Sequence, residues 1–399
     1  MPGPGDPELV YLDHAATTPV RPEAVEAMLP FLDQQYANPS GSHRFARRAR
    51  RALDDARESV ADVLGCAPGE VVFTSGGTES DNTAIAGVVA RRGGAAVCSA
   101  AEHHAVLHAV ERAGGTVVRT DAAGRVDRDH LAHVLDDVVR AGGLVSVVSA
   151  MVVNNEVGTV DDVPAIATLA RRRAPGVVVH TDAVQAPCWV DLRAVTPHVD
   201  LLSLSAHKFG GPKGVGVLVV RDGAPVEPLL VGGGQERERR SGTQNVAGVV
   251  AMAVALRLAD AEREIERVRI GALRNRLVGR LAAELPDVRE TVAAADKVAG
   301  SAHVCFLGIE NEALLYLLDE GGVCASAASA CAAGAMEPSH VLAAMGVDRA
   351  WATGALRLTL GRTTTAADVD RAVEVLVPAV RHLRAHGGAG DAVGAGATR

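Results

Sequence analysis

The sequence predicts an α/β protein with a mostly parallel sheet of seven strands in its larger part, followed by a smaller α+β unit. Seven short apolar runs occur in the first 220 residues, and segments of helical periodicity separate most of them. This alternation indicates parallel strands with helices on both faces of the sheet. The alternation then stops at a long charged segment of helical periodicity, after which a shorter set of strands and helices follows.

The limits of the predicted elements follow from where the apolar or periodic runs start and stop. In the first part we expect strands at 71–75, 95–100, 116–120, 144–152, 177–181, 201–206 and 215–220, with helices that include 80–91 and 105–113. In the second part we expect a long helix over about 256–285, strands at 303–309, 323–326 and 355–360, and helices at 312–320 and 366–385.

We place a domain boundary inside the long helix. Residues 15–262 would form the large domain, and residues 1–14 together with 263–386 would form the small domain. The ends of the chain, 1–8 and 387–399, are rich in Gly, Ala and Pro and are expected to be disordered.

The bulk composition narrows the class of protein. With 48% apolar residues the chain can bury a large core, and its net charge of −8 argues against direct nucleic-acid binding. The sequence shows neither a signal-peptide pattern nor an apolar run of about 20 residues, which predicts a soluble cytoplasmic protein and no membrane contact. The six cysteines follow no metal-binding spacing, so we expect no metal ion and mostly reduced, buried thiols: Cys66, Cys98, Cys188, Cys305, Cys324 and Cys331.

Lysine is rare in this chain, and two of the few lysines lie close together. There are three lysines against thirty-seven arginines, and Lys208 and Lys213 are five residues apart. Arginine replaces lysine as a surface charge, but its guanidinium is never deprotonated and cannot act as an amine nucleophile. A lysine that forms a Schiff base therefore has to be kept. Lys208 directly follows a predicted strand, where open α/β sheets hold cofactors, although a solvated loop lysine is the alternative.

Polar residues also follow the neighbouring predicted strands. The turn from Ser75 to Ser80 opens a helix, so its backbone N–H groups suit a phosphate, unless Thr78 or Ser80 simply caps the helix. The other strand ends carry Glu102-His103-His104, Asn154-Asn155-Glu156 and Asp182-Ala183-Val184-Gln185. Adjacent histidines point to different sides of an extended chain, which disfavours a joint metal site.

Together these groups complement a pyridine aldehyde phosphate. Such a cofactor needs an amine, an anion beside the ring nitrogen, a flat group over the ring, a donor at the phenolic oxygen and a phosphate cup. In that order, the sequence offers Lys208, Asp182, His103, Gln185 with Asn155, and Gly77-Thr78 with Ser205 and His207. A dinucleotide-binding fold would explain neither the lysine nor the acid at a strand end.

Three motifs resemble those of a known family. They are Tyr11-Leu12-Asp13-His14-Ala15-Ala16-Thr17-Thr18-Pro19, Thr74-Ser75-Gly76-Gly77-Thr78-Glu79-Ser80-Asp81-Asn82 and Leu356-Arg357-Leu358-Thr359-Leu360-Gly361-Arg362, and the likeness extends over nearly the whole chain. The family is the cysteine desulfurases, within class V of the fold-type-I pyridoxal-phosphate enzymes. The resemblance implies a fold-type-I transferase with pyridoxal 5'-phosphate as cofactor and L-cysteine as substrate.

The resemblance also implies roles for individual residues. Lys208 resembles the lysine that binds the cofactor covalently, Asp182 the partner of the ring nitrogen, and His103 the residue stacked on the ring. The remaining matches are the polar neighbours Asn155 and Gln185 and the phosphate-contacting residues Gly77, Thr78, Ser205, Ala206 and His207. Thr243 matches a residue that reaches the phosphate from a second subunit, which implies an obligate homodimer.

The last motif is Ser329-Ala330-Cys331, in a run of small residues. By composition alone, Cys331 would be a small buried apolar residue. Its match to the family's mobile catalytic loop, here about 325–338, instead implies that Cys331 is the catalytic cysteine, whereas the other five cysteines match no catalytic position. The length of the loop resembles the long-loop branch, whose cysteine travels from the cofactor to an acceptor protein.

The expected activity is conversion of L-cysteine to L-alanine with a persulfide on Cys331. The sulfur would pass to acceptor proteins such as an iron–sulfur scaffold or a tRNA-thiolating enzyme. Arg357 is the candidate for the substrate carboxylate, assisted by Asn155, because a guanidinium binds a carboxylate in two places. His103 is the candidate to accept the thiol proton. Two alternatives are a class V aminotransferase or cysteine lyase without a role for Cys331, and an inactive scaffold for sulfur carriers.

Overall fold

The structure, a computed structural model, describes residues 9–327 and 339–387. Its main feature is a seven-stranded sheet in the order β2-β8-β7-β6-β5-β3-β4. The strands are β2 (Val71–Thr74), β3 (Ala95–Ser99), β4 (Thr116–Val118), β5 (Val145–Ser149), β6 (Val178–Asp182), β7 (Leu201–Ser205) and β8 (Gly216–Val220). Strand β8 is antiparallel to both of its neighbours, and the other adjacent strands run parallel. The predicted mostly parallel sheet of seven strands is confirmed.

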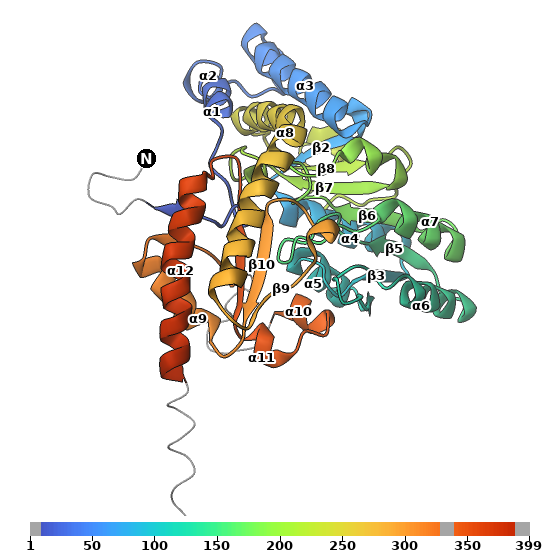
Figure 1. Cartoon of the computed structure of the whole chain (residues 1–399). Helices are drawn as coiled ribbons and strands as arrows, with labels where there is room; N and C mark the ends of the chain where they lie inside the picture. Colours follow the sequence, from blue (N-terminus) through green and yellow to red (C-terminus); the bar gives the residue numbers. More distant parts are fainter. Residues whose placement is uncertain (1–8, 328–338, 388–399) are drawn as a thin grey trace, which may run out of the picture.

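Helices cover both faces of this sheet (Figure 1). On one face, α4 (Gly77–Arg92) and α5 (His104–Arg112) pack against strand residues such as Val72 and Val147. On the other face, α3 (Arg44–Leu64), α6 (Arg128–Arg140), α7 (Val163–Arg173) and the first part of α8 (Val246–Glu284) pack against residues such as Phe73 and Val148. Central strands buried on both faces have no polar side, which explains their continuous apolar runs in the sequence.

Helix α8 is longer than predicted. It covers 39 residues from Val246 to Glu284, whereas the predicted helix began near residue 256. Most of the stretch from Val246 to Leu256 is buried, so it has no polar face that would show helical periodicity in the sequence. The side chain of Asn245 caps the helix by accepting a hydrogen bond from the backbone N–H of Gly248 at 3.0 Å.

Helix α8 also connects two apolar clusters of the core. Its residues Val249 and Ala259 belong to the cluster on the large sheet, and its residues Ile270 and Leu281 belong to a second cluster. The predicted domains are 15–262 for the large one and 1–14 with 263–386 for the small one. The predicted boundary between residues 262 and 263 lies between these two sets of α8 residues. These limits stay a prediction.

The second cluster surrounds a three-stranded antiparallel sheet in the order β12-β10-β9. Its strands are β9 (Val288–Glu290), β10 (Ser301–Phe306) and β12 (Ala355–Thr359), and beside it β1 (Val10–Tyr11) pairs in parallel with β11 (Val323–Cys324). The helices of this part are α9 (Asn311–Glu320), α10 (His340–Ala344), α11 (Arg349–Ala352) and α12 (Ala366–Gly387), while α1 (Pro22–Met28) and α2 (Pro30–Asp33) contact α8. Strand β9 was not predicted, because two of its three residues are charged and no apolar run marks it.

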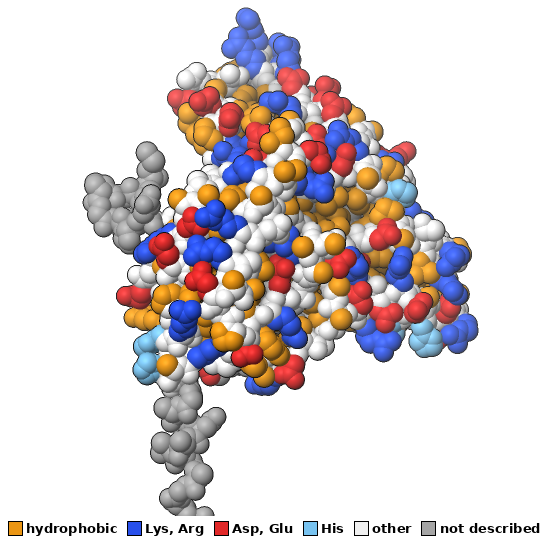
Figure 2. All heavy atoms as spheres, viewed as in Figure 1, with side chains coloured by type: hydrophobic (Ala, Val, Ile, Leu, Met, Phe, Trp, Pro, Cys, Tyr) orange, Lys and Arg blue, Asp and Glu red, His pale blue; other side chains and the backbone are white. Residues whose placement is uncertain are grey.

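Only one residue of the two predicted disordered ends belongs to the part of the chain that the structure describes. Gly387 is the last residue of α12, so the helix extends one residue into the predicted tail 387–399. The rest of that tail and the predicted disordered segment 1–8 lie outside the described residues. On the face shown in Figure 2, acidic and basic side chains are mixed and neither sign forms a continuous field. Within 9–327 and 339–387, no helix has the length and apolar character needed to cross a membrane.

Candidate active site

A cleft opens at the carboxyl ends of the central strands, and segments that follow β2, β3, β6 and β7 line it. It contains about 1860 Å³ of space between protein atoms, part of it open to solvent. Ten of the predicted site residues line this cleft: Gly77, Thr78, His103, Asn155, Asp182, Gln185, Ser205, His207, Lys208 and Arg357. Parallel strands bring their carboxyl ends to one edge of the sheet, so segments far apart in the sequence meet there.

Three predicted site residues are not part of the lining. Ala206 is fully buried next to Ser205, and Thr243 is exposed on a separate loop. Cys331 lies outside the described residues. Ser326 and His340, which come before and after the segment that contains Cys331, both line the cleft. The described chain therefore approaches the cleft on both sides of that segment.

The turn between β2 and α4 presents a helix end that suits an anion. The N-cap residue of α4, Gly76, has no side chain that could accept a hydrogen bond from the first N–H groups. The alternative that Thr78 or Ser80 caps this helix is therefore wrong, and the hydroxyl of Ser80 donates instead to the carbonyl of Gly76 at 3.1 Å. A Cβ on Gly77 would lie 2.8 Å from Val184 Cγ2, so glycine is needed for this close packing. Uncapped N–H groups and the positive helix end fit a phosphate.

Lys208 lies in a short 3-10 turn directly after β7. Its Nζ donates hydrogen bonds to the carbonyl oxygens of Ala15 at 2.5 Å and Ala16 at 2.9 Å. Burial, and after it the positive charge of Arg357, lower the pKa of Lys208 to about 8, although the charge of Asp182 acts in the opposite direction. Near neutral pH a larger share of this amine is uncharged than for an ordinary lysine, as attack on a carbonyl requires.

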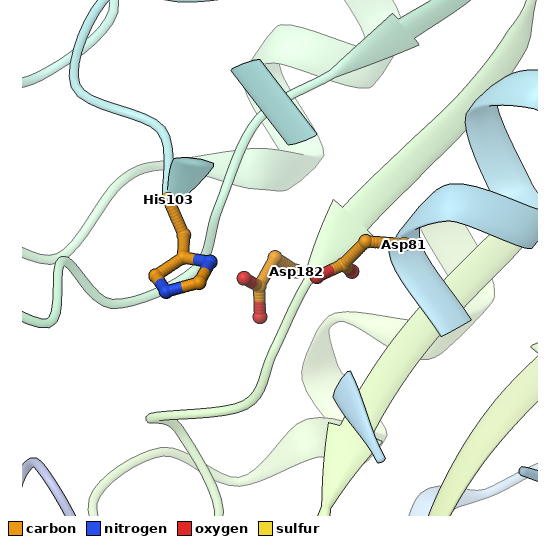
Figure 3. A group of neighbouring side chains, drawn as sticks. All are labelled: Asp81, His103 and Asp182. Atoms are coloured by element: carbon orange, nitrogen blue, oxygen red, sulfur yellow. The ribbon is translucent and has the colours of Figure 1, made fainter. Parts of the chain in front are cut away.

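Asp182 and His103 meet at the floor of the cleft (Figure 3). Asp182 ends β6 and is 5% exposed, and its Oδ1 accepts a hydrogen bond from the N–H of Val184 at 2.8 Å. Burial raises the pKa of Asp182 to about 6, while the charge of Lys208 opposes that effect. The ring of His103 caps α5 by accepting from the N–H of Ala105 at 3.1 Å, and the residue faces the open cleft. The protein atoms packed around the ring lower its pKa, and the charge of Lys208 lowers it further, so the neutral ring, able to accept a proton, is favoured.

Arg357, on β12, contributes its positively charged guanidinium to the cleft lining. Its Nη2 donates to Asp13 Oδ1 at 2.7 Å, and its Nη1 donates to the carbonyl oxygen of Asn155 at 3.0 Å. The sequence singled out Arg357 and Asn155 but not Asp13, although Asp13 lies in one of the three motifs. The pair is 344 positions apart, so no local pattern could reveal it.

Two further predicted residues hold the N-terminal segment at the cleft. Gln185 Nε2 donates to the carbonyl oxygen of Ala15 at 2.7 Å, and His207 Nδ1 lies 3.2 Å from Thr17 Oγ1. Ala15, Ala16 and Thr17 thus form a wall of the cleft. Sequence reasoning found these residues only as part of a motif, because their role here is carried mainly by backbone carbonyl groups.

The loop that carries Thr243 is held by a buried ion pair. Arg57 donates to Glu236 through Nη1 at 2.7 Å and through Nη2 at 2.8 Å. Glu236, Arg237 and Glu238 have φ angles of 50°, 57° and 63°, a left-handed conformation that is uncommon for residues other than glycine. Such backbone persists where surrounding contacts hold it, and it is typical of functional loops. The contact of Thr243 with a second subunit stays a prediction.

The five cysteines of the described ranges offer no thiol to the cleft. Cys98 and Cys305 are buried, and Cys66, Cys188 and Cys324 are partly buried. Burial raises the pKa of all five thiols, which disfavours the reactive thiolate. None of the five is among the residues that line the cleft.

Comparison with known proteins agrees with this geometry. Residues 10–372 match the family model described as aminotransferase class-V. The chain is 42% identical to cysteine desulfurase IscS of Methanosarcina thermophila, over 94% of this chain and 93% of the relative. It is 44% identical to an IscS-like cysteine desulfurase of Mycobacterium tuberculosis, over 94% of this chain and 97% of the relative. The solved structure of a NifS-like protein aligns with a TM-score of 0.86 at 34% identity, covering 94% of this chain and all of that one.

The chain therefore belongs to the class V aminotransferases, a family of enzymes that use pyridoxal phosphate. Within that family it belongs with the IscS-like cysteine desulfurases, which it matches along nearly its full length.

The residues of the cleft fit pyridoxal phosphate. Lys208 offers an amine of lowered pKa, Asp182 a buried carboxylate, His103 a ring in the cleft lining, and the start of α4 an uncapped set of N–H groups. These are the groups that the aldehyde, the ring nitrogen, the ring face and the phosphate require. When bound, the cofactor supplies a ring that withdraws electrons from the substrate carbon next to the amino group.

The lowered pKa of Lys208 predicts how cofactor attachment depends on pH. Because the neutral amine is the attacking form, the rate constant for reconstitution of cofactor-free protein should rise up to about pH 8 and then level off. Stopped-flow absorbance at a series of pH values measures this rate constant. A rate constant that keeps rising toward pH 10 would contradict the environment described for Lys208.

Proposed function

We propose that the protein converts L-cysteine to L-alanine and collects the sulfur as a persulfide on Cys331. The observation that carries this proposal is the convergence of Lys208, Asp182 and Arg357 on one cleft, with Ser326 and His340, the flanks of the Cys331 segment, in its lining. The identity of the relatives as cysteine desulfurases supports the substrate assignment.

The proposed reaction needs no reagent beyond the substrate. The Cβ–S bond of cysteine breaks as the Cys331 thiolate attacks the sulfur and an S–S bond forms. The sulfur is thereby oxidised to the persulfide level, and Cβ is reduced to the methyl group of alanine. In this proposal Lys208 moves the proton of the substrate Cα, and His103 accepts the proton of the Cys331 thiol; the presence of both residues in the cleft lining supports these roles.

Arg357 and Asn155 are the proposed anchors of the substrate carboxylate. Arg357→Lys keeps a positive charge but loses the planar guanidinium that binds a carboxylate in two places. We expect KM for cysteine to rise about tenfold or more, the equivalent of one lost charge-assisted hydrogen bond, while the absorption of bound cofactor is unchanged. The matched control is Arg381→Lys, an exposed arginine of α12 outside the cleft lining. Equal KM values in the two variants would remove Arg357 from the substrate site.

We further propose that the active form is a cytoplasmic homodimer. The exposed position of Thr243, on a loop held in an unusual conformation by Glu236, supports a contact with a second copy of the chain. The sulfur would then leave Cys331 for acceptor proteins such as an iron–sulfur scaffold or a thiolation enzyme.

Product analysis tests the proposed function. Purified protein is incubated with L-cysteine and an excess of a thiol reductant, and the organic products are quantified. We expect L-alanine and sulfide in equal amounts. Pyruvate and ammonia in place of alanine would identify a cysteine lyase, and an amino-group transfer to an added keto acid would identify an aminotransferase.

A further inference from the structure

Three buried acidic side chains lie close together at the cleft: Asp81 and Asp182 are part of its lining, and Glu102 is not. Asp81 of α4 is 1% exposed, Glu102 is fully buried, and Asp182 is 5% exposed. Figure 3 shows Asp81 projecting from its helix toward Asp182, with His103 on the far side of Asp182. One ligand atom from each of Asp81, His103 and Asp182 lies within 4.8 Å of the other two. The proposed function uses Asp182 and His103 but assigns no role to Asp81.

No permanent cation neutralises Asp81 in the described part of the chain. The basic group within ion-pair distance is His180, whose Nε2 lies 3.6 Å from Asp81 Oδ1. His180 is completely buried between Ser149 and Ser203, with ring-nitrogen to hydroxyl distances of 2.8 and 3.0 Å. Burial lowers the pKa of His180 to about 3, so this imidazole is neutral at physiological pH. Asp81 Oδ1 has no hydrogen-bond partner.

Two buried carboxylates with oxygen atoms within 4.8 Å of each other strongly disfavour the state in which both are charged. Asp182 is the better place for the negative charge, because the N–H of Val184 donates to it and the cation of Lys208 acts on it. For Asp81, burial and the charges of Asp182 and Glu102 raise the pKa well above its ordinary value. A hydrogen bond from the side chain of Ser203 acts in the opposite direction without reversing that shift. The proton that the pair retains therefore belongs on Asp81.

We propose that Asp81 is a positioning residue that stays protonated and directs its proton toward Asp182, so that the single negative charge of the pair rests on Asp182. The inference depends on the proposed function, because it assumes that Asp182 faces the ring nitrogen of the cofactor. Asp81 itself does not touch the reacting atoms. Its neutral carboxyl group stabilises the anion that keeps the ring nitrogen protonated.

The charge state of Asp81 is measured directly by infrared spectroscopy. The full-length holoenzyme should show a carbonyl stretching band of a protonated carboxylic acid that disappears in Asp81→Asn. Glu102→Gln is the matched control, because Glu102 is the neighbouring buried acid, its Oε2 also has no hydrogen-bond partner, and the variant should lose only the contribution of Glu102. An unchanged protonated-acid band in Asp81→Asn would show that Asp81 is ionised and would overturn the proposal.

The effect on Asp182 is measured by nuclear magnetic resonance of cofactor labelled with nitrogen-15 in the ring. In Asp81→Asn the side chain is still uncharged and its N–H group can still donate to Asp182. The ring nitrogen should therefore titrate as in the unmodified enzyme. Asp81→Ala removes the donor, and the titration midpoint should fall by about one pH unit, a tenfold change in proton affinity. Equal midpoints in Asp81→Ala and the unmodified enzyme, or a ring nitrogen deprotonated in Asp81→Asn, would overturn the proposal.

Asp182→Asn separates this inference from the proposed function. If Asp182 is the partner of the ring nitrogen, this variant should leave the nitrogen unprotonated at neutral pH. A protonated nitrogen in Asp182→Asn would refute the assignment of Asp182 and, with it, the role of Asp81. A deprotonated nitrogen there, together with an unchanged midpoint in Asp81→Ala, would refute the role of Asp81 alone.

Discussion

Replacing Lys208 with alanine should abolish turnover and remove the visible absorption of covalently bound cofactor. Alanine carries no amine, so no covalent bond to the aldehyde forms and no group at this position moves the substrate Cα proton. Loss of a residue used in covalent catalysis lowers kcat by several orders of magnitude. The helix end at α4 and the carboxylate of Asp182 remain, so we expect loose cofactor binding that dialysis reverses. Absorption spectra before and after dialysis, together with alanine production, measure both effects.

Lys208→Arg tests whether the amine or the positive charge of Lys208 matters. Arginine keeps the charge near Asp182 but cannot act as a nucleophile. We therefore expect Lys208→Arg to be as inactive as Lys208→Ala. Full activity or an undiminished absorption band in either variant would show that Lys208 is not the residue that binds the cofactor.

Replacing Cys331 with serine should stop alanine formation while leaving the cofactor in place. The hydroxyl of serine has a far higher pKa than a thiol and does not attack sulfur at neutral pH. Lys208, Asp182 and Arg357 do not depend on this thiol, so the absorption band and its change on adding cysteine should persist. Alanine production, measured by amino-acid analysis, should fall by several orders of magnitude.

Cys66→Ser is the matched control for the serine substitution. Cys66 is partly buried, lies outside the cleft lining, and has a pKa that burial raises to about 12. We expect this variant to keep its activity. A comparable loss in both variants would mean that cysteine replacement damages the fold instead of removing a nucleophile.

The large sheet could be predicted from the sequence because the burial of each strand is visible in a short stretch of residues. Each central strand is buried on both faces, so it appears as an apolar run, and most strand ends lie within one or two residues of the ends of these runs. The run 144–152 is the exception: β5 ends at Ser149, because residues 150–152 are buried and apolar without belonging to the strand. The same logic failed at Val246 to Leu256, where a buried helix also appears as an apolar run. It failed again at β9, where two of three residues are charged.

The site residues were predictable to the extent that each stands at a strand end or in a motif. Lys208, Asp182 and His103 were found in this way, and the structure brings them to one cleft. The pairing of Arg357 with Asp13 and the proximity of Asp81 to Asp182 could not be predicted, because they arise from packing between distant segments. Gly76 as the cap of α4 was missed because glycine offers no side-chain signal.

The central claim is that Cys331 takes the sulfur of the substrate. The most direct measurement is to incubate the enzyme with L-cysteine labelled in its sulfur, digest it under non-reducing conditions and locate the label by mass spectrometry. We expect a persulfide on the peptide that contains Cys331, and no labelled peptide in Cys331→Ser. Label on another cysteine, or undiminished alanine formation in Cys331→Ser, would contradict this account, because a group other than Cys331 would then take the sulfur.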